Sequence, residues 1–107
     1  MKKGDIVLVK YPFTDLSAEK LRPALVLLQE DEENDLLLAF ITSSTIRKNP
    51  FDILILKEKT GLHKDSIVRL KKLMTIHKSI IAGKIGNVSE EQWQEIEMGL
   101  RRMFNFT

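Results

Sequence analysis

Apolar residues fall in short blocks over the first three-quarters of the chain, and this pattern predicts strands. The blocks are separated by polar or turn-forming segments and cover residues 5–13, 22–29, 35–43, 51–57, 66–73 and 79–85. Pro12 stops the first block because proline cannot donate a ladder hydrogen bond, and Pro23 stands near the start of the second. The third block, DLLLAFITS, is almost continuously apolar, which predicts a strand buried on both faces.

The spacing of the apolar residues changes to that of a helix in residues 89–103, SEEQWQEIEMGLRRM. Apolar residues recur there at three- to four-residue spacing: Trp93, Ile96, Leu100 and Met103. Ser89 with Gln92 three residues later gives the pattern of a capping box, and Gly99 weakens the helix slightly. Short antiparallel strands followed by one terminal helix describe a small, strongly bent barrel, so we expect a mainly β fold with a C-terminal helix.

Length and composition favour a single domain over residues 1–107. The chain has 43% hydrophobic residues, and we find neither an internal repeat nor a Pro/Gly-rich linker. A domain of this size buries roughly two-thirds of its unfolded surface, so self-association would add stability and a homodimer is expected. Cysteine is absent and no apolar run is long enough for a signal peptide or a membrane span. We therefore expect a cytoplasmic protein.

Positive charge gathers in one part of the chain although the net charge is only +2. Residues 57–84 contain eight Lys or Arg against two acids, Glu58 and Asp65. Such a run is compatible with a solvated face and also with a site for a polyanion.

Arg22 precedes a proline at the start of the second predicted strand, directly after a polar loop. A guanidinium at a strand entrance can stay hydrated, and its donor fork can hold a phosphate through two parallel hydrogen bonds. The alternative is an ion pair with Asp15 or Glu19 in the preceding loop.

Hydroxyl groups cluster in ITSST, residues 41–45, at the end of the third predicted strand. They could orient a phosphate or a ribose hydroxyl, or they could close a turn. A metal site is not expected, because the two histidines, His63 and His77, are isolated and the chain has no cysteine. Phosphate-loop, dinucleotide-binding and GxSxG motifs are also absent from the sequence, so no cofactor is expected.

Three blocks together resemble the MazF/PemK family of toxin endoribonucleases, the toxic halves of toxin–antitoxin pairs. They are GDIVLVKYPFTDLSAEKLRPALVL (4–27), FITSS (40–44) and TGLHKDSIVRLKKLMTIHKSIIAGKIGNVS (60–89), in the family's order and spacing. The resemblance implies an SH3-like (PemK/CcdB-like) antiparallel barrel, a homodimer, and metal-independent cleavage of single-stranded RNA that leaves a 2′,3′-cyclic phosphate. It also implies neutralisation by an acidic antitoxin.

The resemblance assigns the reaction to Arg22 and Thr42. Arg22 would stabilise the phosphorane, but it keeps its proton at any workable pH and so leaves the proton acceptor unassigned. The remaining residues expected to contact RNA come from the first hairpin loop (13–21), the hydroxyl cluster (41–45) and the basic stretch 57–84: Phe13, Thr14, Lys20, Ser43 and Arg69. Tyr11 and Phe13 could stack on bases, or at least one of them could belong to the core.

Lys71 and Met74 depart from the family pattern, in which several relatives carry an acidic and a basic residue at these positions. If those positions help to read RNA, the cut site should differ or cleavage should be lost. The alternative function is therefore a non-enzymatic binding module of the same fold, either a topoisomerase inhibitor or an inactive relic.

Overall fold

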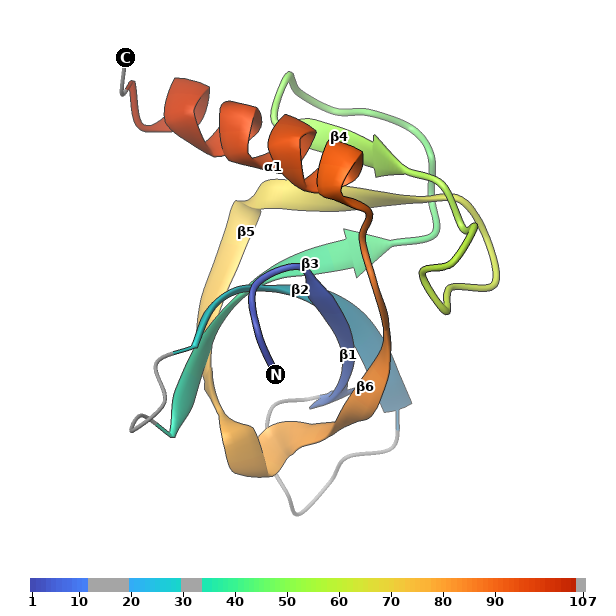
Figure 1. Cartoon of the computed structure of the whole chain (residues 1–107), viewed down its shortest axis with the longest axis vertical. Helices are drawn as coiled ribbons and strands as arrows, with labels where there is room; N and C mark the ends of the chain where they lie inside the picture. Colours follow the sequence, from blue (N-terminus) through green and yellow to red (C-terminus); the bar gives the residue numbers. More distant parts are fainter. Residues whose placement is uncertain (12–19, 30–33, 106–107) are drawn as a thin grey trace.

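Six strands form one antiparallel sheet in the order β4-β5-β3-β2-β1-β6, and one helix follows them. The computed structural model (Figure 1) describes residues 1–11, 20–29 and 34–105. The elements are β1 (Asp5–Tyr11), β2 (Lys20–Gln29), β3 (Asp35–Thr42), β4 (Asp52–Ile55), β5 (Ser66–His77), a short 3₁₀ helix η1 (Lys78–Ile80), β6 (Ile81–Asn87) and α1 (Glu90–Met103). The predicted mainly β fold with a C-terminal helix is confirmed.

The sheet curls strongly, and α1 lies across β4 and the first part of β5 (Figure 1). Within the part of the chain that the structure describes, no strand pairing joins the two edge strands, β4 and β6. Among these described residues the sheet is strongly curled but has no closing row of hydrogen bonds.

Both faces of the central strands are buried, which is why their sequences are almost continuously apolar. In β3, Leu36 and Leu38 belong to one core cluster, whereas Ala39 and Ile41 belong to the other. The first cluster also contains Val7, Val9, Ala24, Val26 and Ile76. The second lies under α1. The prediction that this strand is buried on both faces is confirmed.

Strand β5 is longer than predicted and bends in the middle. The sequence indicated residues 66–73, but the strand continues to His77. Phe40 pairs with Arg69 and the preceding Ala39 pairs with Leu73, so residues 70–72 bulge out of the ladder. Leu70 at this bulge is fully buried. The bend turns β5 so that its two halves line different parts of the molecule.

Helix α1 begins as the capping pattern predicts and packs through its small and apolar residues. Ser89 caps the helix, its Oγ accepting a hydrogen bond of 3.1 Å from the N–H of Gln92. Ile96 is fully buried, and Trp93 packs against the same core. Gly99 is also buried, and a Cβ there would come within 2.7 Å of Leu70 Cδ1. The glycine costs helix propensity but lets α1 lie close to the bend of β5.

Candidate active site

Arg22 lies near the start of β2, where it is exposed. It pairs across the ladder with Val9, and its guanidinium carbon lies 5.1 Å from the centre of the Tyr11 ring. This cation–π contact holds the side chain over the end of β1. Tyr11 is therefore an exposed partner of Arg22 and not a core residue. The expected competitors for an ion pair, Asp15 and Glu19, lie outside the described residues.

Thr42 ends β3 on the neighbouring strand. The ladder pairs Ala24 with Phe40, and continuing this antiparallel register by two residues sets Arg22 opposite Thr42. The Thr42 Oγ1 accepts a hydrogen bond of 3.2 Å from the N–H of Ser44. The hydroxyl thus closes a turn, as one alternative expected, and its own O–H remains a donor that can point elsewhere.

Arg22 and Thr42 line a cavity of about 420 Å³, here called the Lys64 cavity. Its polar walls come from β2, from the end of β3, from the loop before β5 and from the first residue of β5: Lys20, Arg22, Thr42, Ser43, His63, Lys64 and Ser66. The expected RNA contacts Lys20 and Ser43 therefore lie beside the expected catalytic pair.

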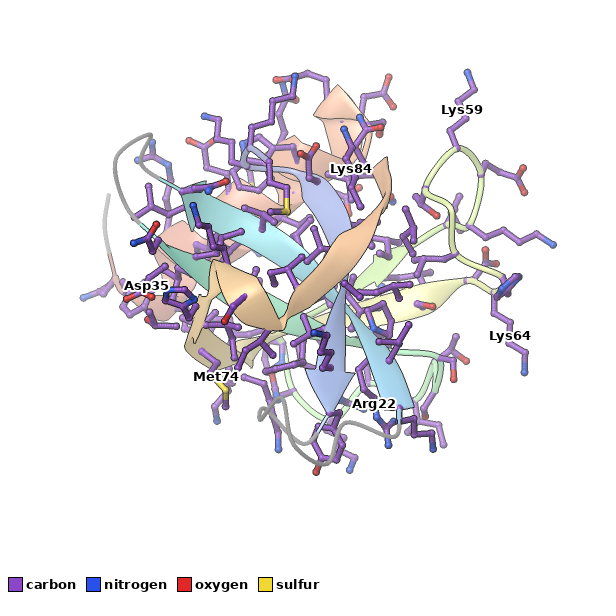
Figure 2. All side chains as sticks on the ribbon, turned by 90° about the horizontal axis from the view of Figure 1, so that it is seen from below. Arg22, Asp35, Lys59, Lys64, Met74 and Lys84 are labelled. Carbon is purple, nitrogen blue, oxygen red and sulfur yellow. The ribbon has the colours of Figure 1, made fainter. Side chains whose placement is uncertain are left out.

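Arg22 and Thr42 also line a second depression of about 340 Å³, here called the Met74 hollow. Its walls come from β1, β2, β3 and β5: Tyr11, Arg22, Phe40, Ile41, Thr42, Arg69, Lys72 and Met74. Figure 2 shows Arg22 between Lys64 and Met74, which project on opposite sides of it. The pair thus lines both depressions.

Arg69, another expected RNA contact, lies on the wall of the Met74 hollow and forms an ion pair. Its Nη1 is 2.7 Å from Oδ2 of Asp52, and the two side chains are 15% and 1% exposed. Of the two departures from the family pattern, Met74 lines this hollow, whereas Lys71 is exposed at the bend. Two further expected contacts, Phe13 and Thr14, lie outside the described residues.

Sequence reasoning gave no role to His63 and included Lys64 only as part of the basic stretch 57–84; the fold brings both to the Lys64 cavity. Their loop is tied down by a hydrogen bond of 2.8 Å from the Lys57 N–H to Asp65 Oδ1. It also passes close to β6 at Gly61 and Gly86, where a Cβ on either residue would strike the opposing backbone. Isolated histidines carry no motif, so only the tertiary contact reveals this placement.

The two depressions are electropositive. Among the described residues their walls carry five cations and no carboxylate: Lys20, Arg22, Lys64, Arg69 and Lys72. Clefts lined by one sign of charge attract ligands of the opposite sign. Part of the basic run 57–84 is thus a site wall and not merely a solvated face, although Lys84 is paired with Asp5 at 3.2 Å.

Neither a metal-binding cluster nor a membrane-spanning helix occurs among the residues described. No group of three potential ligands among His, Asp and Glu side chains comes together there. None of the helices in this part of the chain has the length and apolar character that a membrane crossing requires.

Comparisons with known proteins identify the family of the chain. Residues 2–104 fit the family described as PemK-like, MazF-like toxin of type II toxin-antitoxin system. Endoribonuclease MazF2 of Mycobacterium bovis and endoribonuclease MazF6 of Mycobacterium tuberculosis are each 29% identical over 92 residues, with 80% of both chains covered.

Solved structures share the fold. Toxin MazF-mt6 of Mycobacterium tuberculosis superposes with a TM-score of 0.78 at 21% identity, covering 96% of this chain and 98% of the toxin. The MazE–MazF structure of Deinococcus radiodurans gives 0.79 at 14% identity, with 100% and 97% covered. A mycobacterial endoribonuclease in complex with its cognate antitoxin gives 0.80 at 14% identity over the same shares. With its family pattern matched over residues 2–104 and its fold shared, the chain belongs to the MazF/PemK family of toxins of type II toxin–antitoxin systems.

Proposed function

We propose that the protein is a sequence-selective, metal-independent endoribonuclease that cleaves single-stranded RNA and is neutralised by a cognate antitoxin. The observation that carries the proposal is the placement of Arg22 and Thr42 on adjacent strands, between two depressions whose described walls bear five cations and no carboxylate. Relatives of this family bear the name endoribonuclease, which supports the same reaction here.

The proposed reaction is an attack of the ribose 2′-oxygen on the neighbouring phosphorus. The 2′-OH loses its proton to solvent, the new P–O2′ bond forms, and the P–O5′ bond breaks. Its electron pair stays on the 5′-oxygen, which takes a proton from solvent, and the other fragment ends in a 2′,3′-cyclic phosphate. The phosphorane carries additional negative charge, so a fixed guanidinium binds it more tightly than the ground state. Arg22 supplies that guanidinium and Thr42 donates a hydrogen bond to a phosphate oxygen.

The dimensions and lining of the site favour an unpaired strand. Bases of single-stranded RNA can be splayed apart and bound on either side of the reacting phosphate, whereas a duplex hides their edges. The Lys64 cavity and the Met74 hollow lie on the two sides of Arg22, and each is of a size typical for small-ligand pockets.

The same positive walls suit the antitoxin. An acidic antitoxin segment that folds onto the two depressions would satisfy their cations and exclude RNA. The solved mycobacterial relative in complex with its cognate antitoxin supports such a partner. A homodimer as the acting unit is expected from the small size of the domain, which gains stability when further surface is buried. We place this unit in the cytoplasm, a reducing compartment that suits a chain without cysteine.

The test is incubation of the purified protein with a long single-stranded RNA in the presence of EDTA. Discrete fragments ending in 2′,3′-cyclic phosphate are expected. Arg22→Ala should reduce the cleavage rate by ~10²- to 10³-fold, because it removes one preorganised donor. Arg102→Ala removes an exposed cation from α1, outside both depressions, and should cleave at the wild-type rate. RNA that remains intact across varied sequences would favour the non-enzymatic binding module.

A further inference from the structure

The Arg69 guanidinium is held in place by a buried carboxylate. Asp52 and Arg69 face each other across β4 and β5, and Asp52 Oδ2 lies 2.7 Å from Arg69 Nη1. The same oxygen accepts a hydrogen bond of 2.7 Å from the N–H of Lys48, in the loop that follows β3. A carboxylate fixed by two donors and almost fully buried has little freedom, so the arginine that it holds is also fixed.

The bend in β5 presents this guanidinium to the Met74 hollow. Arg69 is the last residue paired with β3 before the bulge at 70–72. Lys72 within the bulge and Met74 after it line the same hollow. Tyr11 and Phe40 supply aromatic side chains to the hollow. Aromatic and thioether side chains around a basic group form the type of surface on which an unpaired nucleobase packs.

The main contribution of Arg69 to this hollow is a set of N–H hydrogen-bond donors with fixed directions, and its contribution to the net charge is smaller. Asp52 offsets its positive charge, and the bond between them uses one of the five N–H groups that a guanidinium carries. Two parallel N–H donors match two adjacent acceptors. Guanine presents O6 and N7 in this way, and cytosine presents O2 and N3 on its Watson–Crick edge, which is accessible in a single strand. Adenine and uracil alternate donors with acceptors along their edges.

We propose that Arg69, positioned by Asp52, is a specificity-determining residue that selects a base with two adjacent acceptors, guanine or cytosine, next to the scissile phosphate. The inference rests on the proposed ribonuclease function for the meaning of the scissile position. It goes beyond that function in naming the bases that this chain selects and the residue pair that selects them.

Binding of short 2′-O-methyl oligonucleotides tests the inference without cleavage, because the attacking hydroxyl is blocked. Fluorescence anisotropy of a set that varies one position at a time should show about tenfold or more tighter binding for guanine or cytosine at one position. Where guanine is the preferred base, 7-deazaguanine, which lacks N7, should bind without that preference. Unchanged affinity would contradict the reading of O6 and N7 by Arg69. Equal affinity for all four bases, or a preference for adenine or uracil, would overturn the inference.

Variants separate recognition from folding. Arg69→Gln should remove the base preference, whereas Arg101→Gln, which breaks the exposed ion pair with Glu97 on α1, should retain it. Asp52→Asn keeps an acceptor for the Lys48 N–H but loses the charge that holds Arg69, so the preference should weaken. Ile55→Val is a control for stability: it lies on β4, as Asp52 does, and should lower the stability of the fold without changing Arg69. This variant should keep the base preference. If Arg69→Gln binds with the wild-type base preference, the role assigned to Arg69 is wrong.

Mapping the ends of fragments from wild-type cleavage shows which of the two proposals fails, the ribonuclease function or the base selection by Arg69. A base preference in binding without any cleavage would contradict the ribonuclease function alone. Cleavage at sites with neither guanine nor cytosine beside the cut would contradict this inference alone.

Discussion

Gly61 and Gly86 cross with their backbones in close contact, so that the loop before β5 rests directly on β6. Gly61 also has a φ of 82°, a conformation that favours glycine. This crossing holds the loop that brings His63 and Lys64 to the wall of the Lys64 cavity. Two glycines far apart in sequence thereby position part of the candidate site.

Gly86→Ala should destabilise the fold by roughly 2 kcal/mol or more, because the new Cβ meets the backbone at Thr60, which cannot rotate away. Gly83→Ala is the matched control in the same strand, since a Cβ there meets nothing within 4 Å and should change stability by less than about 0.5 kcal/mol. Urea unfolding followed by circular dichroism measures both. Equal stability of the two variants would disprove the close crossing.

Gly99→Val should cost roughly 1–3 kcal/mol, because the added side chain presses on Leu70 and Ile53 under α1. Leu70→Ala alone should cost about 2–5 kcal/mol through the cavity it leaves. In the double variant the valine occupies part of that space, so the combined loss should be smaller than the sum of the single losses. Simple additivity in denaturant unfolding would show that the two residues do not contact each other.

The affinity for RNA should depend on salt through the cations of the two depressions. For single strands, removing one cation that binds a phosphate makes the slope of log K against log salt shallower by about 0.7. Lys64→Ala and Lys72→Ala should each produce such a change with an uncleavable 2′-O-methyl RNA. Arg101→Ala on α1 serves as the control and should leave the slope unchanged. If Arg101→Ala alters the slope as much as the lysine variants do, the proposed binding of RNA along the two depressions is wrong.

Trp93, the single tryptophan, should report the docking of α1. Its ring packs against the core, and the Lys3 ammonium lies 5.6 Å from the ring centre. Emission from the native protein should therefore lie at shorter wavelength than emission from the protein in concentrated urea. A native spectrum equal to that of the unfolded chain would mean that the helix face carrying Trp93 is in water.

The strands and the helix could be predicted because their signals are local. Alternating or continuous apolar runs mark β1 to β6, and the cap at Ser89 marks the start of α1. The prediction ended this strand at Leu73, whereas in the fold β5 passes a bulge at residues 70–72 and continues to His77. Leu70 gives no local signal of that bulge, since its burial depends on α1 arriving from the other end of the chain.

The sequence by itself indicated the class of the fold, its C-terminal helix and the family, and it led to the proposed pair Arg22 and Thr42, because each of these rests on residues close together in the chain or on a resemblance over nearly its whole length. Only the tertiary structure decided that this pair separates two positive depressions, that Asp52 holds Arg69 at one of them and that His63 and Lys64 line the other. These relationships join β4 to β5 and the loop before β5 to β6. Charge pairing and close backbone contact act through space, and the spacing of residues along the chain does not encode them.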